Sequence, residues 1–100
     1  MEKRTPHYGL MDVQAAVAVR GIDCFTRSAQ EGAAAMGLAS AQALAAIQNL
    51  TRQDFHKSMT TYADHAVWQD VYHCPTAVGL AYVKFTLRED GSIVISFKEL

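Results

Sequence analysis

The sequence predicts an α+β domain in which helices from the first half pack on one face of a mostly antiparallel sheet from the second half. Residues 10–50 are rich in alanine and carry apolar side chains at helical spacing. Residues 55–98 are instead rich in threonine, tyrosine, valine and other strand-forming side chains. With 100 residues, half of them hydrophobic, the chain is expected to form a single domain (1–100) around one core.

The first quarter of the chain is expected to contain a polar arm, a helix and a short strand. Residues 1–8 carry several charges and a proline, which favour an extended arm. Leucine and valine recur three and four residues apart over residues 10–20, which predicts a helix. Gly21 follows at the position where helix ends favour glycine. The short run 22–25 is interpreted as a small edge strand.

Two further helices are expected before the composition changes. Thr26 is a suitable N-cap for a helix over residues 27–36, and Gly37 is expected to end it. Ser40 is the expected cap of a third helix over residues 41–50. The many alanines favour helix because they lose little side-chain entropy on folding.

The first strand pair is expected over residues 55–62 and 67–73. Only four residues separate the two runs, so an antiparallel hairpin is predicted. Pro75 is expected to stop the second strand. Both faces of this hairpin mix polar and apolar side chains, so alternation alone leaves open which face meets the helices.

The second hairpin, over residues 79–88 and 92–98, alternates cleanly enough to predict its register. A two-residue loop would place polar side chains opposite apolar ones. A three-residue loop ending at Gly91 instead places Phe85 opposite Ile95, on one apolar face. Such loops require a left-handed residue, which glycine adopts readily.

This register has a consequence for the polar face. Tyr82 is predicted to lie directly opposite Lys98. By the same alternation Lys57 and Gln69 can share a face of the first hairpin, whereas His56 is expected to point the other way.

The charge, the cysteine content and the hydrophobic runs limit the functions that the chain can have. Nine basic and ten acidic residues give a net charge of −1, so any contact with nucleic acid must rest on a local basic patch. Cys24 and Cys74 are interpreted as reduced thiols rather than a disulfide framework. No signal peptide or membrane-spanning run is visible.

Three segments resemble the motility quorum-sensing regulator toxins, the MqsR family of RelE-like toxins. They are the opening MEKRTPH, the central KSMTTYADHAVWQDVY and the closing IVISFKE. The resemblance implies a RelE-like fold, a bacterial cytoplasmic setting, and cleavage of messenger RNA at short GC-containing sites. It also implies neutralisation by a partner antitoxin, MqsA. The family's active-site residues carry over onto Lys57, Gln69, Tyr82 and Lys98.

These four residue types suit RNA cleavage without a metal or cofactor. RNA supplies its own nucleophile, the 2′-hydroxyl, so the protein needs a base, an acid and donors for the charged phosphorane. We expect Lys57 to be the base because a neighbouring cation lowers a lysine's pKa. Lys98 would stabilise phosphorane charge, an effect worth roughly 3 kcal/mol per donor. Tyr82 would donate to the leaving oxygen or hold the scissile phosphate, and Gln69 would orient the ribose or read a base. The roles of base and acid could be exchanged.

Further residues are expected to extend the RNA-binding surface. Lys84 and Arg88 share the polar face of the second hairpin and would continue a phosphate track. His73 has the same parity as Gln69 and is expected to border the cleft. The arm at residues 1–8 is either solvated or adds its cationic side chains to this rim.

Two alternative functions remain open. A histidine-dependent ribonuclease is the first, because His56, His65 and His73 lie near the first hairpin. A module that binds RNA or the antitoxin without cutting is the second. No pair of ligands has the spacing of a zinc site. Trp68 and Tyr72 are expected in the core rather than stacked on bases.

Overall fold

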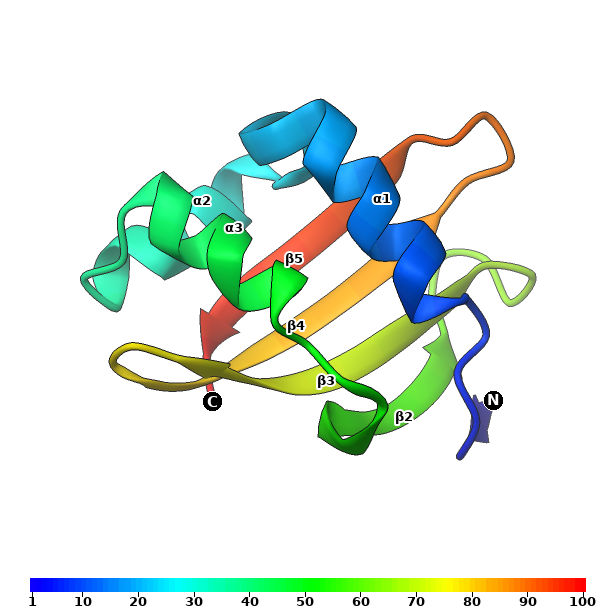
Figure 1. Cartoon of the computed structure of the whole chain (residues 1–100). Helices are drawn as coiled ribbons and strands as arrows, with labels where there is room; N and C mark the ends of the chain where they lie inside the picture. Colours follow the sequence, from blue (N-terminus) through cyan, green and yellow to red (C-terminus); the bar gives the residue numbers. More distant parts are fainter.

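The computed structural model describes residues 1–100 as three α-helices and a five-stranded antiparallel sheet, which confirms the predicted α+β class (Figure 1). The helices are α1 (Leu10–Arg20), α2 (Arg27–Ala35) and α3 (Ser40–Gln48), with 3-10 turns η1 (Gly21–Cys24) and η2 (Arg52–Asp54). The strands, in their order across the sheet, are β1 (Glu2–Lys3), β2 (Phe55–Thr60), β3 (Trp68–Thr76), β4 (Gly79–Leu87) and β5 (Ile93–Glu99). None of the helices is long and apolar enough to cross a bilayer.

The helices begin and end close to the predicted positions. Gly21 takes a positive φ of 60° after α1, and the Thr26 hydroxyl accepts a hydrogen bond from the Ala29 N–H at 3.1 Å at the start of α2. The third helix begins one residue earlier than predicted. Ala39 is its N-cap, and the Gln42 side chain accepts the Ala39 N–H at 2.8 Å.

The prediction of an edge strand at residues 22–25 was wrong. Residues 21–24 form the 3-10 turn η1, and only Phe25 makes a single parallel bridge, to Ile95. Phe25 and Cys24 are buried. The apolar side chains of this segment therefore pack in the core. In so short a run, the sequence pattern of a buried turn cannot be distinguished from that of a strand.

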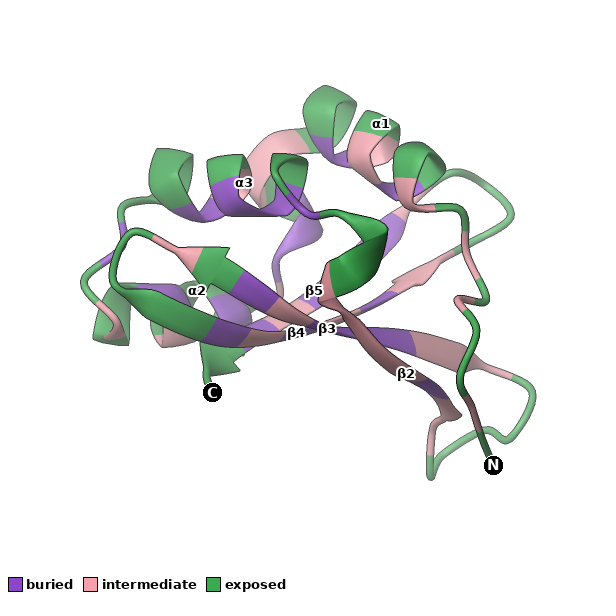
Figure 2. Ribbon diagram, turned by 60° about the horizontal axis from the view of Figure 1, so that its bottom comes forward, coloured by how far each residue is buried: buried purple, intermediate pink, exposed green.

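The core lies between the sheet and the two helices α1 and α3. Figure 2 shows the buried residues of both helices on the sides that face the strands. The largest fully buried apolar side chains come from both layers: Val13, Val17, Ile47, Tyr72, Val83, Phe85 and Ile95. Burial of this kind contributes about 1.5–3 kcal/mol per large side chain, so it dominates the stability of the fold.

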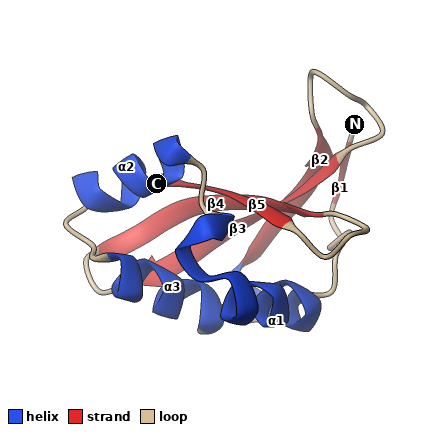
Figure 3. Ribbon diagram, turned by 90° about the horizontal axis from the view of Figure 1, so that it is seen from above, coloured by secondary structure: helices blue, strands red, loops and turns tan.

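The second helix takes a different position, along β5 at the edge of the sheet. Figure 3 shows α2 on the other side of β5 from α1 and α3. Its backbone touches the strand at Gly32, where an added Cβ would overlap the carbonyl oxygen of Phe97. Glycine at this position therefore allows the helix to cover the outer edge of β5.

The β4–β5 hairpin has the predicted register. Phe85 pairs with Ile95 and Tyr82 pairs with Lys98. Gly91 takes the left-handed conformation in the loop, with φ of 84°. This agreement follows from the clean alternation of the two strands, since a slip of one residue would bury lysine and expose isoleucine.

The β2–β3 hairpin is antiparallel as predicted but contains a β-bulge. Phe55 pairs with Tyr72, whereas Lys57 pairs with Val71, so His56 is an extra residue in β2. The bulge reverses the alternation, so Phe55 and Lys57, which would share a face in a regular strand, lie on opposite faces.

Pro75 does not stop β3, contrary to the prediction. The strand continues to Thr76, and Pro75 pairs with Leu80 of β4. Beyond Tyr72 the strand has no partner from β2, so it is an edge strand there and tolerates a residue without an N–H.

Candidate active site

The face of the sheet opposite α1 and α3, which we call the open face, carries all four of the expected active-site residues. Pairing across the strands places the following side chains on it, from β2 to β5: Lys57, Met59, Gln69, Val71, His73, Tyr82, Lys84, Thr86, Val94, Ser96 and Lys98. His73 and Lys84, two of the expected RNA-binding residues, lie on the same face.

The three residues His73, Tyr82 and Lys98 form one row across β3, β4 and β5. They are direct cross-strand neighbours, with His73 paired to Tyr82 and Tyr82 paired to Lys98. The Lys98 ammonium lies 5.5 Å from the centre of the Tyr82 ring, and the His73 ring lies 6.1 Å from it on the other side. The Tyr82 ring is thus flanked by a cation and an imidazole.

A second row lies beside the first and contains both remaining lysines of this face. Lys57 pairs with Val71, Val71 with Lys84, and Lys84 with Ser96. Lys84 also borders a shallow hollow of about 200 Å³. Its lining residues are Ser28, Tyr82, Lys84, Ser96, Phe97 and Lys98. Ser28 comes from α2 and was not anticipated, because nothing in the sequence indicates that α2 reaches this face.

Gln69 and Arg88 lie further from the row of His73, Tyr82 and Lys98. Gln69 is four residues along β3 from His73, about 13 Å in an extended strand, but only two residues from Val71, the partner of Lys57. Arg88 is exposed at the end of the second hairpin and borders a separate hollow with Arg20 and Asp23. The structure therefore brings together three lysines, a tyrosine and a histidine, with the glutamine to one side and Arg88 outside the group.

The amino-terminal arm supplies a carboxylate to this group. The Glu2 Oε1 atom lies 2.7 Å from the Lys57 ammonium, whose side chain is only 24% exposed. The hydrogen bond and charge of Glu2 raise the pKa of Lys57, and the nearby Tyr82 adds to the rise. This is the opposite of the direction expected for a base, so Lys57 is an ammonium at neutral pH.

The arm is held in place by contacts with β2 and β3, although most of its side chains are exposed. Glu2 and Lys3 pair with β2 as the short strand β1. The buried Asp70 carboxylate accepts the backbone N–H groups of His7 at 3.0 Å and Tyr8 at 2.9 Å. The sequence did not predict the ion pair between Glu2 and Lys57, because no local pattern links residues so far apart in the chain.

His56 lies on the open face, and the expectation that it faces away was wrong. Its ring stacks on that of His73, with 4.3 Å between ring centres and 23° between planes. The bulge is the cause, because it turns the extra residue to the same side as Lys57. The sequence contained one indication of the bulge: polar and apolar side chains are mixed on both faces of this strand, as they are where the alternation is interrupted.

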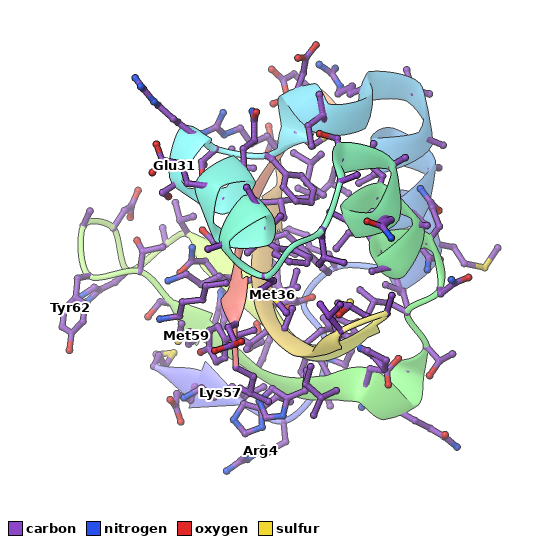
Figure 4. The ribbon with its side chains drawn as sticks, turned by 90° about the vertical axis from the view of Figure 1, so that its left-hand side faces the viewer. Arg4, Glu31, Met36, Lys57, Met59 and Tyr62 are labelled. Atoms are coloured by element: carbon purple, nitrogen blue, oxygen red, sulfur yellow. The ribbon has the colours of Figure 1, made fainter.

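The aromatic residues and His65 occupy different environments. Tyr72 is fully buried in the core, as expected. Trp68 is half-buried beneath the arm, where the Lys3 ammonium lies 4.2 Å from its ring and the His7 ring stacks on it. Figure 4 shows Tyr62 on the β2–β3 loop, pointing away from the strands, with Lys57 and Arg4 near each other at the arm. His65 is exposed on the same loop.

Comparison with known proteins identifies the family to which the chain belongs. The sequence profile described as "Motility quorum-sensing regulator, toxin of MqsA" matches residues 5–99. The chain belongs to the MqsR toxin family. The resemblance noted in the sequence is thereby confirmed, and it extends through the alanine-rich helices, which were not among the resembling segments.

A curated member of the MqsR family is closely similar over its whole length. The mRNA interferase toxin MqsR of Escherichia coli (strain K12) is 43% identical over 99 residues, which cover 99% of each chain. The open face described above therefore belongs to a chain that matches a named mRNA interferase toxin over nearly its whole length.

Proposed function

We propose that this chain is an mRNA interferase, a toxin that acts as a metal-independent endoribonuclease and is neutralised by an MqsA-like antitoxin. The cleavage would proceed by attack of the RNA 2′-hydroxyl on the adjacent phosphate, at short GC-containing sites of messenger RNA. The observation that carries the proposal is the row His73, Tyr82 and Lys98 beside Lys57 and Lys84 on the open face. The name of the E. coli relative and the family's description as a toxin of MqsA support it.

The lysines suit the scissile phosphate. Lys84 and Lys98 line the same hollow as Tyr82, so a phosphate bound there meets two ammonium groups and a hydroxyl. Donors placed where negative charge develops contribute about 3–4 kcal/mol each to catalysis. Lys57, held as an ammonium by Glu2, is a third cation for the phosphorane. Tyr82 is the group placed to give a proton to the departing 5′-oxygen.

The distant residues suit the neighbouring nucleotides. Gln69 shares the open face and lies beyond Lys57, on the side away from Tyr82 and Lys98, so we assign it to a base or ribose next to the cleaved bond. Arg88 would contact only an RNA long enough to reach the end of the second hairpin. Lys84 and His73 are closer and would bind the phosphates that flank the cleavage site.

The proposal is tested with purified protein, a defined single-stranded RNA and excess EDTA. We expect products with 5′-hydroxyl and 2′,3′-cyclic phosphate ends. Lys98→Ala and Tyr82→Phe should each lower the single-turnover rate by about 10²–10³-fold. Arg27→Ala is the matched control, since it removes an exposed cation whose side chain is 95% accessible on α2.

Three results would contradict the proposal. They are the absence of cut RNA, products with other ends, or rates in Lys98→Ala and Tyr82→Phe equal to that of Arg27→Ala. Binding of RNA without cutting would instead indicate the non-catalytic module. Co-expression with an MqsA-like antitoxin should relieve growth arrest caused by the chain, which tests the partner separately.

A further inference from the structure

We infer that His56 is the general base of the proposed cleavage, accepting the 2′-hydroxyl proton on its imidazole while Lys57 beside it binds the phosphate. The inference rests on the proposed function and changes the residue that performs one of its steps. A base is required because an RNA 2′-hydroxyl attacks phosphorus efficiently only as its proton leaves. The sequence left a histidine-dependent ribonuclease open but expected His56 to face away from the site, and the four expected active-site residues include no histidine.

The bulge in β2 places the imidazole at the site. His56 and Lys57 are consecutive residues, yet both face the open side, because the strand gains an extra residue between Phe55 and Lys57. Stacking on His73 fixes the ring of His56, with 4.3 Å between their centres. His73 is in turn paired with Tyr82. The imidazole of His56 is thereby held beside the row that ends in Lys98.

Lys57 itself is unsuited to accept a proton. Its ammonium makes an ion pair of 2.7 Å with Glu2, and this contact raises its pKa above the ordinary 10.5. At neutral pH the side chain carries its proton almost entirely. Removal of the proton would also leave the Glu2 carboxylate without its partner. Lys57 therefore acts as a donor and a positive charge.

The surroundings of His56 favour its neutral form. Burial against the neighbouring side chains lowers its pKa from 6.5, and three nearby groups, His73, Lys57 and Arg4, lower it further. Glu2 acts in the opposite direction and is the smallest contribution. A neutral imidazole is thus available at pH 7 between groups that repel a second positive charge.

The step balances within these residues. The 2′-hydroxyl oxygen forms a bond to phosphorus and its proton passes to the imidazole of His56. The bond from phosphorus to the 5′-oxygen breaks, and the Tyr82 hydroxyl gives that oxygen a proton. Imidazolium and phenolate then return to their starting states by proton exchange with water. The products are a 2′,3′-cyclic phosphate and a 5′-hydroxyl.

The two possible bases predict different pH profiles. With His56 as base, the cleavage rate falls as pH decreases through its pKa below 6.5 and is level above it. With Lys57 as base, the rate rises with pH throughout the range up to its pKa above 10.5. Single-turnover cleavage of a short RNA between pH 5 and pH 9 in EDTA, corrected for uncatalysed hydrolysis, separates these cases.

The variants His56→Phe and His56→Gly test the assignment, with His65→Phe as the matched control on the exposed loop. Phenylalanine keeps a ring to stack on His73 but cannot accept a proton. We expect His56→Phe to lose about 10²–10⁴-fold in rate and to lose the fall at acid pH. Imidazole added to His56→Gly should restore part of the rate, and His65→Phe should match the wild type.

The inference is overturned if His56→Phe keeps the wild-type rate and acid fall, if the wild-type rate rises steadily to pH 9, or if His56→Gly loses activity that imidazole does not restore. Circular dichroism of each variant confirms that it is folded. Failure of the wild-type chain to cut RNA would refute the proposed function instead, so the two failures are distinguishable.

Discussion

The attachment of the arm by Asp70 can be tested by removing its carboxylate. Asp70 is fully buried on β3 and accepts the N–H groups of His7 and Tyr8. Hydrogen bonds to a charged group contribute about 1.5–3 kcal/mol each, so two are worth roughly 3–6 kcal/mol. We expect Asp70→Ala to lower the free energy of unfolding by about 3 kcal/mol, the lower end of that range, because a detached arm can return its N–H groups to water.

Urea denaturation followed by circular dichroism measures this change, and thermal denaturation gives a second estimate. For a domain of this size, a loss of about 3 kcal/mol corresponds to a fall in Tm of roughly 12–24 °C. Glu89→Ala is the control, since it removes an exposed carboxylate in the β4–β5 loop. Its effect should be within about 0.5 kcal/mol.

The same substitution has a consequence at the open face. Release of the arm removes Glu2 from Lys57, so the pKa of Lys57, measured by NMR titration, should fall in Asp70→Ala. A loss of stability below about 1 kcal/mol would refute the reasoning. An unchanged Lys57 pKa would do the same, because it would mean that Asp70 does not hold the arm.

Two further predictions concern stability. Gly32→Ala should destabilise the fold by about 2 kcal/mol in urea denaturation, because its Cβ would overlap the Phe97 carbonyl. Helix propensity alone would instead make Gly32→Ala stabilising. The control is Ala35→Gly on the exposed side of the same helix, which should lower the free energy of unfolding by about 1 kcal/mol through propensity alone. Stability should also fall above pH 9, because burial raises the pKa of Cys74 and of Tyr72 to about 12 each. The folded state keeps protons that the unfolded state releases from about pH 9 and 10, so stability is level below pH 9 and decreases toward pH 12. Urea midpoints from pH 7 to 11 measure this, and a constant midpoint would contradict it.

The second hairpin was predictable down to residue pairs, and the reason is physical. Its strands alternate strictly, so only one register keeps Phe85 and Ile95 together on the buried face. The partners of Tyr82 and Lys98 follow from that constraint alone. Helix ends at Gly21 and Thr26 were predictable for a similar reason, since caps are local and depend on few residues.

The remaining parts of the site depend on contacts between distant segments. The ion pair between Glu2 and Lys57 requires the arm to pair with β2, and the arm is attached through Asp70. None of these contacts has a local sequence signal. The position of α2 beside β5 likewise depends on close contact at Gly32, which sequence periodicity does not reveal.

The bulge in β2 reconciles two requirements that a regular strand cannot meet. Phe55 packs against Tyr72 on the helix side, with 5.5 Å between ring centres, while Lys57 faces the open side. In a regular strand these two residues share a face, so either phenylalanine would be exposed or lysine would be buried. Exposure of Phe55 would lose about 1.5–3 kcal/mol, and burial of an unpaired ammonium would cost more. The extra residue, His56, resolves this conflict for the fold, and by the same geometry it adds an imidazole to the open face.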